Sequence, residues 1–199
     1  MTVIDRLAGK LAFWAQVAFI FAYVGILSTA MFVFQFGMGE MPCPLCITQR
    51  MAMMAASLGP VYIIVNSLRD RLTTTKFMVG LGMAVIGAVV GAVMSIRQVE
   101  LHILPGDPGY GTAIMGLHLY TWALVTFVVV VLFAGALLLF GHEFQPIAPE
   151  AKWARTLAWI VVWVFIATIA VNMLVVFAEE GFNLYLPDDP TGYVLFGGK

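Results

Sequence analysis

Cys43 and Cys46 are the two cysteines of this 199-residue chain, and they lie three positions apart in the segment MPCPLCITQR. Two thiols at this spacing can form a small disulfide, which a thiolate of another protein can open through a mixed disulfide. Arg50 follows Cys46 by four residues, so on a helix the two side chains share one face. The segment therefore predicts thiol and disulfide chemistry beside a permanent positive charge.

A helix that begins at this segment would help one thiol to ionise. Pro42 and Pro44 suit the start of a helix, where the backbone N–H groups that proline lacks have no intrahelical partner. The partial positive charge at a helix N-terminus favours a thiolate. Arg50 would stabilise either a thiolate on Cys46 or the anionic form of an electron acceptor that lies against it.

Three other interpretations of these residues stay open. A Cys43–Cys46 disulfide could be purely structural, although a bridge across so short a loop removes little chain entropy and stabilises little. A metal site at the thiolates would need both His102 and His118 as further ligands, and we predict no metal there. The same two histidines could instead ligate a haem iron.

The composition predicts an integral membrane protein. Apolar residues make up 62% of the chain and charged residues 11%, and the mean hydropathy is +0.97. Soluble domains have roughly 45–50% apolar and 25% charged residues. Five apolar segments are long enough, or nearly so, to cross a bilayer as helices, and we expect one all-α membrane domain over residues 1–199. The spans are expected at about 11–36, 47–67, 77–101, 117–141 and 156–178, with an external tail at 179–199.

Lysine and arginine residues predict the orientation, because cytoplasmic loops carry more of them. One side of the membrane receives seven: Arg6, Lys10, Arg69, Arg71, Lys76, Lys152 and Arg155. The other side receives Arg50, Arg97 and Lys199. We therefore expect a cytoplasmic N-terminus in a bacterial inner membrane, with the cysteines and the C-terminus in the periplasm, where disulfides persist.

Charge excludes two classes of function. The net charge of −1, without a basic cluster, gives no reason to expect nucleic acid as a partner. Charged residues are absent from the middle of the predicted spans, so the sequence offers no ion site or proton relay of the kind that transporters use. Membrane lipid is the partner that composition alone predicts.

The segment PCPLCITQR resembles the P-C-x-x-C-x-x-x-R signature of the DsbB family of membrane disulfide-generating proteins. The resemblance extends over about residues 11–141, which would form a four-helix DsbB-like core with the fifth helix added to it. The family takes electrons from a periplasmic thioredoxin-like thiol oxidase and passes them to a membrane quinone. The resemblance thus implies a thiol:quinone oxidoreductase with ubiquinone or menaquinone as cofactor.

The resemblance also implies roles for individual residues. Cys43 matches the outer cysteine, which exchanges with another disulfide, and Cys46 matches the inner cysteine, which attacks the quinone. Arg50 matches the arginine beside the quinone. In RQVELHILP, Gln98 and His102 lie where the family has a histidine and a glutamine four residues apart, with the two residue types exchanged. These two are expected to help bind the quinone.

Two departures from the family pattern affect the predicted function. The chain has no third or fourth cysteine, whereas typical members carry a second pair in a long second external loop. A periplasmic thiol protein would then attack the Cys43–Cys46 disulfide directly, or a cysteine-bearing subunit would supply the second pair. The second departure is the fifth helix, because family members usually end after four. The missing pair, the fifth helix and the tail favour an alternative, in which the chain is a structural or quinone-holding subunit of a larger membrane complex without thiol-oxidase turnover.

Overall fold

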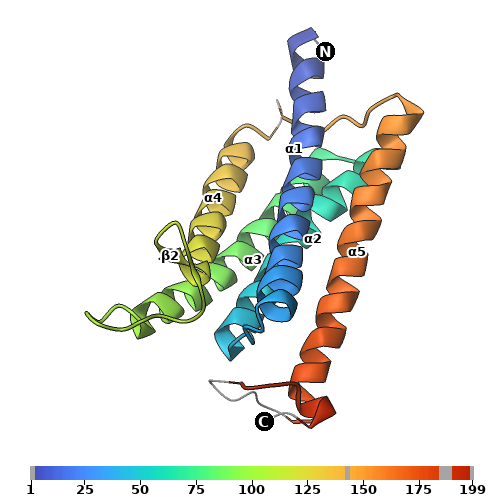
Figure 1. Ribbon diagram of the computed structural model, residues 1–199. Coiled ribbons are helices and arrows are strands. Elements are labelled where there is room, and N and C mark those ends of the chain that lie inside the picture. Colours follow the sequence, from blue (N-terminus) through green and yellow to red (C-terminus); the bar gives the residue numbers. More distant parts are fainter. Residues whose placement is uncertain (1–2, 142–143, 184–189, 198–199) are drawn as a thin grey trace.

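The computed structural model describes residues 3–141, 144–183 and 190–197, and helices dominate it (Figure 1). Within these ranges, five helices are long and apolar enough to cross a membrane, which confirms the predicted all-α membrane bundle. They are α1 (Val3–Ser28), which continues as the π-helix η1 (Thr29–Gly37), α2 (Pro44–Leu68), α3 (Thr74–Leu101), α4 (Leu119–Leu139) and α5 (Lys152–Glu180). Of the predicted tail, residues 184–189 and 198–199 lie outside the described part of the chain.

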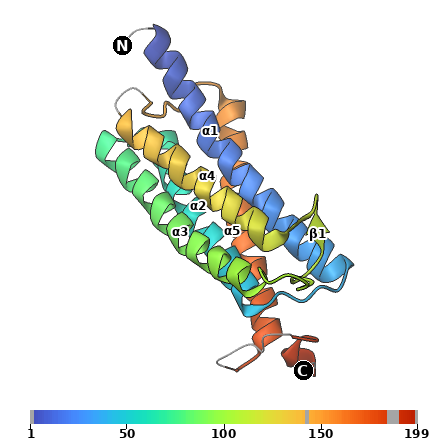
Figure 2. The same cartoon turned by 90° about the vertical axis from the view of Figure 1, so that its left-hand side faces the viewer.

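Short elements lie at one end of the bundle. The strands β1 (Ala113–Ile114) and β2 (Leu117–His118) form an antiparallel hairpin before α4, and the 3-10 helix η2 (Val194–Phe196) follows α5. The N- and C-termini lie at opposite ends of the bundle (Figures 1 and 2). The start of α2, the hairpin and η2 therefore gather at the end away from the N-terminus.

Helix α3 packs closely against α2 and α4, α1 packs against α2, and α5 packs against α1 and α2. Leu27 and Phe127 are fully buried in the cluster that joins α1 to α4. Phe13, Ile64 and Phe165 are fully buried in the cluster that joins α1, α2 and α5. Large apolar side chains also cover the outside, with Phe21, Ile86 and Leu132 each more than 65% exposed. Such a surface suits contact with lipid, where close packing rather than water exclusion joins the helices.

Glycines let α2 and α3 approach closely. A Cβ atom added to Gly87 would collide with the backbone of Ala55 and Ala56, and one added to Gly59 would collide with the backbone of Gly80. A helix backbone cannot move aside as a flexible side chain can. The position of α3 against α2 therefore depends on the absence of side chains at these contacts.

We predict that Gly87→Ala destabilises the bundle by about 1–3 kcal/mol, as overpacking of a tight contact does. Gly82→Ala is the matched control on the same helix, because an added Cβ there has no atom within 4 Å. The measurement is the free energy of unfolding in detergent, followed by helical circular dichroism. Equal stabilities of the two variants would contradict the predicted close contact.

Candidate active site

The cysteine pair lies at the first turn of α2. Pro44 is the first helical residue, and Cys43 caps the helix by accepting a hydrogen bond of 3.2 Å from the backbone N–H of Cys46. Both thiols are free, and their Sγ atoms are 2.6 Å apart. A disulfide between them would therefore need little movement of the backbone. Cys43 is buried, whereas Cys46 is partly exposed.

One buried glutamine contacts both sulfur atoms, and a second buried glutamine holds the first. Gln98 of α3 donates from Nε2 to Sγ of Cys43 at 3.3 Å and to Sγ of Cys46 at 3.5 Å. Its Oε1 atom accepts a hydrogen bond of 2.7 Å from Nε2 of Gln49 on α2. Because Gln49 occupies the oxygen of the Gln98 amide, the nitrogen faces the sulfurs. This arrangement favours a negatively charged sulfur, which only accepts hydrogen bonds.

The two cysteines are unequal. The pKa of the Cys43 thiol is raised well above its ordinary value, mainly by the hydrogen bond with Cys46 and next by burial. Cys43 therefore keeps its proton at neutral pH, and a negative charge on the pair belongs on Cys46. This assignment agrees with the position of Cys46 one helical turn from Arg50.

Arg50 is held by the π-helix that extends α1. Its Nη1 donates to Oε1 of Gln35 at 2.7 Å, and its Nη2 donates to the carbonyl oxygen of Ala30 at 3.2 Å. Gln35 is buried and uses its Nε2 to donate to Oη of Tyr193 at 3.2 Å and to Oε2 of Glu179 at 3.4 Å. π-Helical turns often occur at functional sites. The chain thus brings η1, the end of α5 and the tail together around Arg50.

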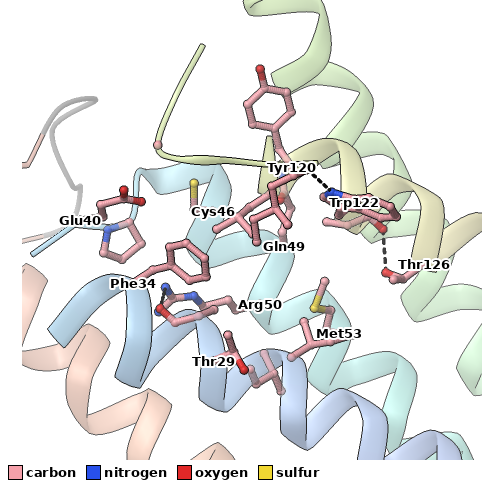
Figure 3. Close-up of a pocket in the computed structure, with 18 of the residues that line it drawn as sticks. Thr29, Phe34, Glu40, Cys46, Gln49, Arg50, Met53, Tyr120, Trp122 and Thr126 are labelled. Atoms are coloured by element: carbon pink, nitrogen blue, oxygen red, sulfur yellow. Dashed lines mark hydrogen bonds between the residues drawn. The ribbon is translucent and has the colours of Figure 1, made fainter. Parts of the chain in front are cut away.

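A cavity of about 520 Å³ opens between α1, α2 and α4, next to the loop before α2 and the loop after α3 (Figure 3). Cys46, Gln49 and Arg50 line it from α2, and its other walls are mainly apolar, with Phe34, Met53, Tyr120 and Trp122 among them. Ligand sites are commonly cavities of roughly 300–1,000 Å³ with a few polar groups on apolar walls. The cavity suits a flat, mostly apolar ring that presents oxygen atoms to Arg50.

The loop before α2 and the loop after α3 meet at the rim of this cavity. Tyr110 donates from Oη to the carbonyl oxygen of Met41 at 2.6 Å. The carboxylate of Glu40 accepts hydrogen bonds from the hydroxyl and the backbone N–H of Thr112. Glu40, Met41 and Tyr110 also line the cavity, so these contacts join the loop before α2 to the loop after α3 beside the cysteine pair.

His102 is not among the residues that line this cavity. Its Nδ1 is 3.0 Å from Oδ1 of Asp107, and its ring stacks on Tyr120 with 5.7 Å between the ring centroids. His118 stacks on the same tyrosine at 5.3 Å. The pKa of Asp107 is lowered mainly by a hydrogen bond from the backbone N–H of Gly109 and next by the one with His102. The carboxylate is therefore charged, and it holds the His102 ring in position.

The structure thus brings four of the five predicted site residues together: Cys43, Cys46, Arg50 and Gln98. Gln98 contacts the sulfurs and is not among the residues that line the cavity. His102 stacks on Tyr120, which lines it. Sequence reasoning missed Gln35 and Glu179, and the one available signal was that both are polar residues near the ends of apolar segments. Among the described residues, no cluster of three or more His, Cys, Asp or Glu side chains could hold a metal ion.

Comparison with known proteins identifies the family. The family model for disulfide bond formation protein DsbB matches residues 12–111, which is half of the chain and includes the cysteine pair, Arg50, Gln98 and His102. The chain belongs to the DsbB family. Family membership and the five long apolar helices of the described residues together show an integral membrane protein. Its α4 and α5 follow the matched region.

Two curated relatives are similar to this DsbB-family chain. A disulfide bond formation protein B of Chromobacterium violaceum is 37% identical over 86 residues, which are 43% of this chain and 49% of the relative. A protein of the same name from Haemophilus influenzae is 26% identical over 105 residues, which are 53% of this chain and 55% of the relative. The chain therefore spans about half the length of the curated relatives it matches. No solved structure matches it.

We predict that Cys46→Ala lowers the pKa of Cys43 toward its ordinary value, because the hydrogen bond and the neighbouring negative charge that raise it are removed. Alkylation of Cys43 then reaches half of its maximal rate at a lower pH than in the reduced wild-type protein. Mass spectrometry of the peptide that contains Cys43 measures this rate as a function of pH. Thr48→Ala, at an exposed position of the same helix, serves as the control, and an unchanged profile in Cys46→Ala would contradict the assignment.

Proposed function

We propose that this protein is a membrane thiol:quinone oxidoreductase that makes or exchanges disulfides in a periplasmic partner through Cys43 and Cys46. The observation that carries the proposal is that Cys46 and Arg50 line one apolar cavity while the two sulfurs lie within bonding reach of each other. Membership of the DsbB family supports it. The partner is a thioredoxin-like thiol protein or a cysteine-bearing subunit.

The thiol step begins with the oxidised pair. A thiolate of the partner attacks Sγ of Cys43, a bond forms between these two sulfurs, and Cys46 leaves as the thiolate. A second partner thiolate then attacks the partner's own sulfur, so the partner gains a disulfide and Cys43 leaves and takes up a proton. Cys43 is buried, so the attack requires the segment that precedes α2 to move aside. Gln98 stabilises the thiolate that this step leaves on Cys46.

The electron-accepting step takes place in the cavity. A quinone bound there supplies a two-electron acceptor. The reduced Cys43–Cys46 pair would give two electrons to the quinone and form its disulfide again, and the quinone would take up two protons to become quinol. Arg50 stabilises the negative charge that develops beside Cys46, and apolar side chains such as Phe34, Met53 and Trp122 exclude water from the cavity.

The five predicted site residues take different parts in this proposal. Cys43 and Cys46 are the catalytic sulfurs, and Arg50 is the group that binds the quinone oxygen. Gln98 acts at the sulfurs, because its amide contacts both of them. His102 positions Tyr120, on which it stacks, and Tyr120 forms part of the cavity wall.

We further propose that the chain works as one unit in the bacterial inner membrane, with its N-terminus in the cytoplasm. Seven of the ten lysine and arginine residues then lie in or near cytoplasmic loops. In this orientation the cysteine pair, the external loops and the C-terminus all face the periplasm, where partner thiols are oxidised. The alternative, a structural subunit without turnover, predicts that the cysteines never transfer electrons.

We predict that Arg50→Gln lowers the rate of quinone reduction on the order of 100-fold, because loss of one group that stabilises developing negative charge has this effect in other enzymes. Arg50→Lys restores part of the rate, since it keeps the charge but lacks the planar fork of donors. The assay supplies a reduced thioredoxin-like protein and a short-chain ubiquinone, and follows quinol formation by absorbance.

Arg97→Gln is the matched control for this prediction. Arg97 is 60% exposed on α3 and pairs with Glu100 at 3.8 Å, outside the cavity. The Arg97→Gln variant is expected to reduce quinone at the wild-type rate. A folded Arg50→Gln protein with wild-type activity would exclude the proposed role of Arg50, and no quinol from the wild type would favour the structural subunit.

A further inference from the structure

Glu179 is a fully buried carboxyl group near the active site. It lies in the last turn of α5, has no solvent-exposed surface, and lies outside the residues that match the family model. Its neighbour in sequence, Glu180, is only partly buried and lines a second cavity between α2 and α5. An acidic side chain is seldom fully buried unless it has a partner.

The hydrogen bonds of Glu179 are too few for a carboxylate that stays charged. Its Oε2 accepts one long bond, 3.4 Å, from Nε2 of Gln35. Its Oε1 has no hydrogen-bond partner among the described residues. A buried carboxylate without partners is costly, whereas a neutral carboxyl group tolerates such surroundings. The geometry therefore suits a group that carries a proton in at least one state of the protein.

Arg50 is the cation next to this carboxyl group, and Gln35 joins the two. Gln35 accepts from Nη1 of Arg50 and donates to Glu179 with the other end of the same amide. Within the part of the chain that the structure describes, the other ionisable groups near Glu179 are Cys46 of α2, Tyr193 of the tail and Glu180 of α5. Two of these described groups are candidate anions for Arg50, the Cys46 thiolate in the cavity and the Glu179 carboxylate.

We propose that Glu179 holds the proton that Cys46 gives up, so that Arg50 always has a single negative partner. In the reduced protein Cys46 is the thiolate and Glu179 is neutral. In the oxidised protein the sulfurs are joined and neutral, and Glu179 is the carboxylate. The inference deepens the proposed function and rests on it, because the electron transfer is what alternates the charge of Cys46. Two adjacent charges of opposite sign cost less to bury than one unpaired cation.

Protons and electrons balance in this scheme. The reduced protein holds two protons that the oxidised protein lacks, one on the Cys43 thiol and one on the Glu179 carboxyl group. Formation of the Cys43–Cys46 disulfide releases two electrons, and both protons leave with them to the quinone, which becomes quinol. Attack by the partner's two thiols returns two electrons and two protons to the protein.

Infrared difference spectroscopy tests the proposal without quinone or partner. The purified protein in nanodiscs is oxidised, then reduced with a water-soluble phosphine, and the two spectra are subtracted. We expect the C=O stretch of a protonated carboxyl group to appear on reduction at neutral pH. The band is lost in Glu179→Gln and is kept in the matched control Glu180→Gln. Absence of the band from the wild type, or its survival in Glu179→Gln, would overturn the proposal.

A second measurement uses the native sequence and so does not depend on how a variant folds. Alkylation of Cys46 in the reduced wild-type protein removes the thiolate, and Glu179 should then lose its proton and the band should disappear. A band that persists after alkylation would also overturn the proposal. Cysteines that cannot be reduced and reoxidised at all would instead defeat the proposed function, so the two failures are distinguishable.

Discussion

A permanently charged guanidinium among apolar helices is the constraint on which the site depends. Arg50 cannot lose its charge, so its surroundings must supply acceptors and negative charge. The carbonyl oxygen of Ala30 and the amide of Gln35 supply the acceptors, and both come from the π-helix that extends α1. The cavity that holds Cys46 opens beside the same guanidinium, which makes this the place where a negative sulfur or a reduced acceptor is stabilised.

The need of Arg50 for a negative partner explains why α5 carries a buried carboxyl group. The family model ends before α4, yet α5 contacts α1 and α2 and brings a buried carboxyl group to the amide that binds Arg50. Tyr193 of the tail binds the same amide. A helix that served only to lengthen the bundle would need no carboxyl group at this position. The addition is therefore part of the active site in our account, and not only a surface for another subunit.

The membrane helices and the shared face of Cys46 and Arg50 could be predicted from the sequence, for physical reasons. Lipid forces each long apolar segment to form a helix, and the spacing from Cys46 to Arg50 places both on one helix face. The contacts of Gln35 with Arg50 and Glu179 join residues up to 144 positions apart, and no local pattern encodes such contacts. That Gln98 and His102 help to bind a quinone stays a prediction. The spacing alone does not reveal that the Gln98 amide contacts the sulfurs, or that the turn after His102 brings Asp107 to its ring.

The stoichiometry of a single anaerobic turnover tests the central claim most directly. The protein is reduced, the reductant is removed, one equivalent of short-chain ubiquinone is added, and quinol and remaining thiols are both measured. Our account predicts one quinol formed and both thiols lost per chain in the wild type, with neither change in Cys46→Ala. Unreduced quinone beside two intact thiols in the wild type would contradict it.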